Sequence, residues 1–121
     1  MMVVTEQQYL AHHGVKGMKW GVRRAIRKYS NKAQRQYDAH MNSAKYIKKI
    51  LDSNYDIVTE GPPDPETRKA YKYEHKREIE AAKKWLATRD DIMNMKISDV
   101  KVKDVKARFR NNGAGSYYPF A

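Results

Sequence analysis

The side chains best suited to metal chemistry are four histidines, of which His12 and His13 are adjacent. Two neighbouring imidazoles on a loop can supply two ligands to a metal ion, and His40 or His75 would have to complete such a site. The chain has no cysteine, and no two histidines are spaced as on one face of a helix. We therefore expect no metal and no cofactor, and we expect His12 and His13 to form hydrogen bonds within the N-terminal segment or its docking surface.

Residues for catalysis are equally sparse. A catalytic site needs a nucleophile with an oriented base, or paired carboxylates in a pocket. The histidines are scattered among basic residues, and the adjacent Asp90 and Asp91 are typical of a surface pair near a helix end. The glycines Gly14 and Gly17 follow no predicted strand and lack the residue pattern of a phosphate-binding loop. The sequence indicates that the protein is not an enzyme.

Positive charge is the strongest compositional feature. The net charge is +11, and residues 15–52 hold eleven lysines and arginines against Asp38 and Asp52. Such a block is typical of a surface for phosphate or for an acidic protein, although it also suits a solvated helix face. Tyrosines between the cations could stack on bases or pack in a core. The cations that could contact nucleic acid without sequence preference are Lys28, Lys32, Arg35, Lys45, Lys48 and Lys49.

Residues 12–24, which read HHGVKGMKWGVRR, combine glycines, cations and a tryptophan at high density. Trp20 is the best candidate anchor, because truncating a tryptophan at an interface centre often costs about 2 kcal/mol or more. The alternative is that it folds back onto the protein's own helices. Flanking glycines would let the backbone approach a partner closely, and arginines could pair with acidic groups there. The residues expected to bind a partner are His12, His13, Gly14, Gly17, Met18, Trp20, Gly21, Arg23 and Arg24.

The string in residues 12–24 resembles a short sequence that recurs near one end of many tailed-bacteriophage virion and head-associated proteins. The resemblance contains no gap and covers about a tenth of the chain. It implies a structural component of a phage particle, such as a minor head- or portal-associated protein held by capsid or portal subunits. It also implies several copies in the virion, assembled in the host cytoplasm. The alternative function is a basic, non-specific DNA-binding protein on the packaged genome, and a third is a small regulatory helical module.

The composition limits the size of the core that could position these residues. A chain of 121 residues with nine tyrosines, six methionines and only two phenylalanines buries a thin core within one domain. No apolar run approaches the roughly 20 residues that span a bilayer, and the N-terminus lacks the pattern of a secretory signal. We expect helices that depend on neighbouring subunits, no membrane partner and no export by that route.

The predicted fold is mainly α: an extended helical hairpin with an irregular N-terminal arm and a flexible C-terminal tail. The expected divisions are a docking arm at residues 1–21, a helical region at 22–110 broken at 53–66, and a tail at 111–121. Gly14, Gly17 and Gly21 should interrupt regular structure in the arm. The first helix should bury one stripe at intervals of three or four residues, namely Val22, Ile26, Tyr29, Ala33, Tyr37, His40, Ala44, Ile47 and Leu51.

The later elements follow from cap and breaker residues. The prolines after Gly61 end any helix, and Tyr55, Ile57 and Val58 beforehand could make a short extended contact. Asp64 should cap a second helix from Pro65 to about Met95. Its expected stripe is Tyr71, His75, Ile79, Ala82, Leu86, Met93 and Ile97, with Trp85 and Ile92 beside it. A third short helix, capped by Ser98 or Asp99, should carry Val102, Val105 and Phe109, and an edge strand over 97–102 is the alternative.

Overall fold

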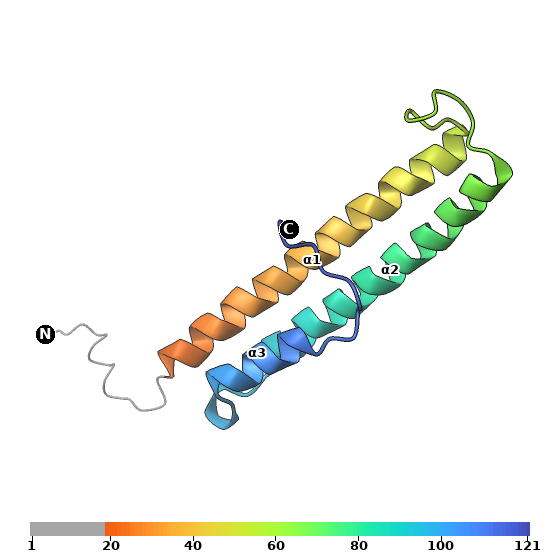
Figure 1. Ribbon diagram of the computed structural model, residues 1–121. Helices are drawn as coiled ribbons and strands as arrows, with labels where there is room; N and C mark the ends of the chain where they lie inside the picture. Colours follow the sequence, from red (N-terminus) through yellow and green to blue (C-terminus); the bar gives the residue numbers. More distant parts are fainter. Residues whose placement is uncertain (1–18) are drawn as a thin grey trace, which may run out of the picture. The chain divides into compact units, whose positions relative to one another are not determined.

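The computed structural model describes residues 19–121, and this part of the chain is mainly helical (Figure 1). Helix α1 spans Trp20–Ser53, α2 spans Pro65–Met93, the short 3₁₀ helix η1 spans Ile97–Asp99, and α3 spans Val102–Arg110. The prediction of a mainly α fold is confirmed. Within residues 19–121, no helix combines the length and the apolar character needed to cross a membrane.

Contacts divide the chain into two units, and the two long helices contribute to both. Of the described residues, unit 1 contains 19–32 and 88–112, whereas unit 2 contains 33–87 and 113–121. The units therefore do not follow one another along the sequence. Unit 1 joins the first turns of α1 to the end of α2 and to α3, and unit 2 joins the rest of both long helices to the C-terminal segment.

The expected stripe of α1 is largely buried, including Val22, Ala33, Ala44 and Ile47. The buried face also includes polar residues and neighbours outside that stripe, namely Ala25, Ser30, Gln36 and Ile50. Several predicted members, namely Ile26, Tyr29, Tyr37 and Leu51, are only half-buried. Alanine leaves room for a close neighbour, and Gln36 is buried because its amide forms hydrogen bonds with the Tyr118 backbone. The contact face is therefore set by what packs against the helix as well as by hydrophobicity.

The expectation that Gly21 interrupts regular structure is wrong. Helix α1 begins at Trp20, so Gly21 lies in its first turn. A single glycine costs a helix about 1 kcal/mol relative to alanine, which a helix of 34 residues can absorb. The other two glycines of the motif, Gly14 and Gly17, lie outside the described residues.

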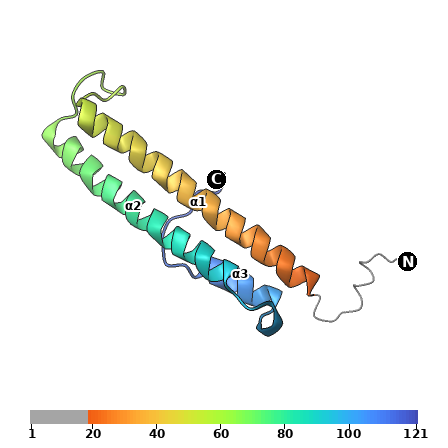
Figure 2. The ribbon, with the colours of Figure 1, turned by 180° about the vertical axis from the view of Figure 1, so that it is seen from behind.

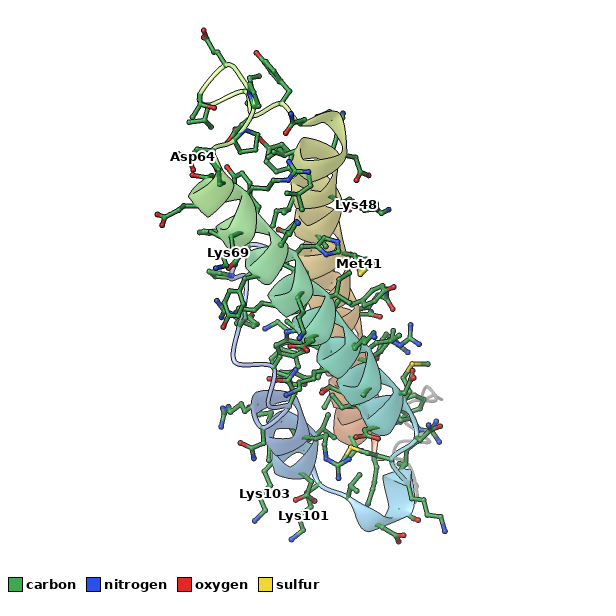
Figure 3. The ribbon with its side chains drawn as sticks, turned by 90° about the vertical axis from the view of Figure 1, so that its right-hand side faces the viewer. Met41, Lys48, Asp64, Lys69, Lys101 and Lys103 are labelled. Atoms are coloured by element: carbon green, nitrogen blue, oxygen red, sulfur yellow. The ribbon has the colours of Figure 1, made fainter. Side chains whose placement is uncertain are left out.

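Side-chain hydrogen bonds stabilise the connection between the two long helices. The predicted cap is confirmed, because Asp64 Oδ1 accepts the backbone N–H of Thr67 at 2.8 Å, and Figure 3 shows Asp64 at the start of α2. The Arg68 guanidinium donates to Asn54 Oδ1 at 2.9 Å and to the Leu51 carbonyl at 3.0 Å. These bonds tie the end of α1 to the beginning of α2, and the parts of the two helices in unit 2 lie side by side (Figure 1, Figure 2).

The loop itself is organised by a buried aspartate. Asp56 forms an isolated antiparallel bridge with Gly61 and accepts the Tyr71 hydroxyl at 2.6 Å. The expected extended contact does not form on the neighbouring apolar residues, because Tyr55, Ile57 and Val58 are exposed. The polar residue between them, and not the apolar ones, holds the loop.

Helix α2 buries Ala82, Trp85 and Ile92, as expected. It ends at Met93, which is exposed, and Ile97 belongs to η1, so the predicted stripe ends earlier than expected. The stripe is also shifted, because Glu78 is buried while Tyr71, His75, Ile79 and Leu86 are half-buried.

Helix α3 buries Val105 and Phe109, as expected, but its cap is not Ser98 or Asp99. Residues 97–99 wind into η1, so neither the predicted cap nor the alternative edge strand is available there. The N-cap is instead Lys101, whose backbone N–H donates to Asp104 Oδ2 at 2.7 Å. Asp104, which lies inside the first turn of α3, thus provides the capping hydrogen bond that was expected from Ser98 or Asp99.

The C-terminal segment contains no helix or strand, in line with the prediction, but it is anchored to unit 2. The Tyr118 backbone N–H donates to Gln36 Oε1 at 2.7 Å, and Gln36 Nε2 donates to the Tyr118 carbonyl at 2.6 Å. Trp85 Nε1 donates to the Ser116 carbonyl at 3.0 Å. The sequence pattern did not indicate this attachment.

Candidate interaction surfaces

The described part of the motif in residues 12–24 forms the start of α1. Trp20 is 45% exposed, and the Arg23 guanidinium carbon lies 5.8 Å from the centre of a Trp20 ring. Arg23 and Arg24 are both exposed. The first turn therefore presents an aromatic ring and two cations together, which suits a partner with an apolar recess bordered by carboxylates.

Two contacts within unit 1 fix the position of this turn. The Lys19 ammonium donates to the carbonyls of Ser98 and Val100, at 3.0 and 3.4 Å. A Cβ built on Gly21 would lie 3.6 Å from Val102 Cγ2, which is an ordinary van der Waals distance. The start of α1 therefore lies against the segment that leads into α3, and Gly21 has no steric need to be glycine in the described structure.

The structure describes only some of the predicted partner-binding residues. Trp20, Gly21, Arg23 and Arg24 lie within the first five residues of α1. The other members of the predicted set lie outside the described residues, namely His12, His13, Gly14, Gly17 and Met18.

The predicted nucleic-acid-binding cations are divided between the two units. Lys28 and Lys32 belong to unit 1, where their ammonium groups lie 5.5 and 5.6 Å from the Tyr29 ring centre. Four others belong to unit 2, namely Arg35, Lys45, Lys48 and Lys49. Lys48 is exposed and pairs with Asp52 at 2.9 Å, a solvated contact of little energetic weight.

The charge is concentrated in unit 1 and not simply in the first half of the sequence. The described residues of unit 1 include thirteen lysines and arginines against four aspartates, a net charge of +9. Unit 2 has eleven against nine, a net charge of +2. The sequence analysis missed the contribution of α3, because its cations are far along the chain from those of α1. Their spacing within residues 101–110 was the available signal.

Unit 2 contains a buried polar cluster that the sequence analysis also missed. His40 Nδ1 lies 2.6 Å from Glu78 Oε1, and the Tyr118 hydroxyl lies 3.0 Å from both oxygens of the same carboxylate. The Ser43 hydroxyl lies 3.2 Å from that of Tyr118. Because a carboxylate only accepts hydrogen bonds, the Nδ1 proton points to Glu78, and His40 Nε2 has no hydrogen-bond partner among the described residues. The cluster joins α1, α2 and the C-terminal segment within unit 2.

A small hollow adjoins this cluster, with a volume of about 120 Å³ and with His40, Glu78, Lys84 and Ser116 among its lining residues. Small-molecule sites usually have volumes of roughly 300–1,000 Å³. This hollow is therefore smaller than a typical small-molecule site, and the hydrogen bonds of the cluster attach the C-terminal segment to α1 and α2.

Within residues 19–121, three side chains have shifted pKa values with clear physical causes. Burial raises the pKa of Tyr118, and the Glu78 carboxylate that accepts a hydrogen bond from the Tyr118 hydroxyl raises it further. The hydrogen bond to Asp56 raises the pKa of Tyr71. The backbone N–H of Thr67 lowers the pKa of Asp64, as expected for a carboxylate at a helix N-cap.

Metal ligands do not gather within residues 19–121, where no three histidine, aspartate or glutamate side chains could hold an ion. His40 is occupied by Glu78, and His12 and His13 lie outside the described residues.

A family model described as a family of unknown function (DUF7211) matches residues 4–26. The match covers the motif and the first turns of α1, about a fifth of the chain. No curated protein and no solved structure matches the chain.

Proposed function

We propose that this protein is a non-enzymatic structural component of a bacteriophage particle, a minor protein of the head or portal region. It docks onto other virion subunits through the segment that ends at Trp20–Arg24. The observation that carries the proposal is the amino-acid sequence of residues 12–24, which resembles a motif found in tailed-phage virion proteins.

The geometry at the start of α1 supports docking. Trp20 keeps 45% of its surface exposed although it begins a helix that is packed in unit 1. Burying the rest of that ring would gain the hydrophobic free energy that makes tryptophan a dominant interface residue. Arg23 and Arg24 then face the partner's acidic groups beside the ring.

The extent of the family match supports an independent docking segment. The matched residues, 4–26, end within the first turns of α1 and leave α2 and α3 outside the match. A short docking segment that is shared by otherwise different proteins would produce a family match limited to that segment. The partners proposed for this docking segment are capsid or portal subunits. Several copies of the chain would be present in each virion, which would assemble in the host cytoplasm.

The test measures incorporation of variants into particles by quantitative mass spectrometry. Trp20→Ala should reduce incorporation at limiting protein by at least about tenfold, since about 2 kcal/mol is lost when a buried tryptophan anchor is truncated. Tyr73→Ala is the matched control, because Tyr73 is an exposed aromatic residue on α2 in unit 2.

Circular dichroism of each free variant separates docking from folding. Equal helicity with reduced incorporation of Trp20→Ala supports the proposal. Incorporation of Trp20→Ala at the level of Tyr73→Ala would contradict the docking role, and absence of the wild-type chain from purified particles would contradict the virion assignment itself.

A further inference from the structure

We propose that unit 1 binds the phosphate backbone of double-stranded DNA without regard to sequence, through exposed cations of α3 and of the neighbouring turns of α1. This inference concerns residues other than Trp20 and does not depend on the virion assignment. It also differs from the set predicted from sequence, because it includes α3 and excludes Arg35, Lys45, Lys48 and Lys49.

The first argument is that unit 1 contains little negative charge to offset its cations. Each of its four aspartates already has a partner inside the unit. Asp90 pairs with Arg89 at 2.7 Å, and Asp91 lies 3.6 Å from Arg108. Asp104 accepts the Lys101 backbone N–H, and Asp99 lies 3.2 Å from the Ser98 hydroxyl. The described residues of unit 1 therefore keep a net charge of +9, which favours an external polyanion.

The second argument is the arrangement of the cations on α3. Lys103, Lys106 and Arg110 are spaced by three and four residues, so they lie along one side of the helix, and all three are exposed. Figure 3 shows Lys103 projecting outward from α3. A row of this kind can follow successive phosphates of one strand.

The third argument is that α1 adds cations next to this helix. Tyr29 of α1 and Phe109 of α3 pack with ring centres 5.3 Å apart. The Lys32 ammonium lies within 6 Å of both ring centres, at 5.6 and 5.9 Å, and the Lys28 ammonium lies 5.5 Å from that of Tyr29. The aromatic contact thus holds two cationic helices together.

The chemistry of this stretch favours phosphate over a protein partner. Between Lys103 and Arg110 the large apolar side chains, Val105 and Phe109, are buried, so the exposed surface is almost entirely cationic. The centres of protein interfaces are poor in charged residues, lysine above all. Release of counterions from duplex DNA, in contrast, requires only positive charge near phosphates.

The experiment compares variants of the full chain for binding to a short fluorescent DNA duplex, by anisotropy, at several salt concentrations. One variant carries Lys103→Gln, Lys106→Gln and Arg110→Gln. Its matched control carries Lys45→Gln, Lys48→Gln and Lys49→Gln, which removes the same charge from exposed positions of α1 in unit 2. A third variant, Arg27→Gln with Lys28→Gln, tests the contribution of α1 in unit 1.

For wild type, the logarithm of the association constant should fall linearly with the logarithm of salt, with a slope of about −0.9 per phosphate contacted. The α3 variant should lose about two to three units of that slope and at least about tenfold in affinity at about 100 mM salt. The Arg27/Lys28 variant should lose about one to two units. The unit 2 control should keep the wild-type slope to within about one unit.

Several results would overturn the proposal. Equal losses in the α3 variant and the unit 2 control would mean that net charge alone governs binding. Absence of DNA binding at low salt would exclude nucleic acid, and equal competition by polyglutamate of matched charge would point to an acidic protein. Trp20→Ala should leave DNA binding unchanged, so failure of the docking proposal and failure of this one are distinguishable.

Discussion

His40 and Glu78 form a buried pair between the two long helices of unit 2, with Nδ1 of His40 2.6 Å from Oε1 of Glu78 and no exposed surface on the histidine. A slip of α2 along α1 by one turn would separate the pair and leave both groups buried without partners. Such a state is costly because buried polar groups that lose their hydrogen bonds are not compensated by water. The pair therefore sets the register between α1 and α2 in this unit.

The first prediction concerns this pair. Glu78→Ala should lower the free energy of unfolding by about 2–4 kcal/mol, because it leaves His40 and the Tyr118 hydroxyl without their acceptor. Urea unfolding followed by circular dichroism measures the change. Glu80→Ala, at an exposed position on the same helix, is the control and should change stability by less than about 0.5 kcal/mol. Equal effects of the two substitutions would show that the cluster does not stabilise the unit.

The second prediction concerns alkaline pH. Because the pKa of Tyr118 is raised in the folded chain above its ordinary value of 10.0, the unfolded chain loses this proton first as pH rises. The stabilisation is fully present below about pH 10 and is lost as pH rises through the raised value. Tyr118→Phe should therefore show a shallower loss of stability above pH 10 than wild type in urea titrations. Tyr73→Phe, at an exposed tyrosine, should follow wild type, and identical pH profiles for all three proteins would refute the assignment.

The third prediction concerns the start of α2. Asp64→Ala removes the acceptor of the Thr67 N–H and should lower the thermal midpoint, whereas Asp64→Asn should retain most of the stability because asparagine also caps helices. The lowered pKa of Asp64 also implies a stabilisation that is present above its ordinary value of 3.8 and lost as pH falls through the lowered one. Thermal melts of the three proteins at neutral and acidic pH test both statements. A melting temperature of Asp64→Ala that matches wild type at neutral pH would be inconsistent with capping.

The fourth prediction compares two glycines. Gly21→Ala should stabilise the chain by up to about 1 kcal/mol, because Gly21 is helical and an added Cβ makes only an ordinary contact with Val102. Gly115→Ala should instead destabilise it by about 1 kcal/mol, because Gly115 has a φ of +71° that alanine adopts poorly. Urea unfolding measures both. If Gly21→Ala is stable but enters particles poorly, the glycine is needed for docking and not for folding; a Gly21→Ala variant less stable than wild type would contradict its place in the helix.

Local signals in the sequence were sufficient to predict the two long helices and the break between them. The stripe from Val22, the break at Gly61 and the cap at Asp64 depend on residues within a few positions of one another, and each predicted feature lies close to its place in the structure. The start of α1 was placed two residues late, because Gly21 was interpreted as a breaker although the rest of a long helix outweighs one glycine.

The sites depended more on tertiary structure than the helices did. The motif in residues 12–24 and the excess of positive charge could both be identified from the sequence alone. The sequence did not show which cations share a unit, because the contacts that join the first turns of α1 to α3, such as Tyr29 with Phe109, link residues about eighty positions apart. His40, Glu78 and Tyr118 likewise belong to three separate segments. The spacing of the first helix placed His40 in its buried stripe, but it gave no sign that Glu78 and Tyr118 would be its partners. Their meeting is decided by the packing of α1, α2 and the C-terminal segment in unit 2, since a buried polar group is stable only where a distant partner completes its hydrogen bond.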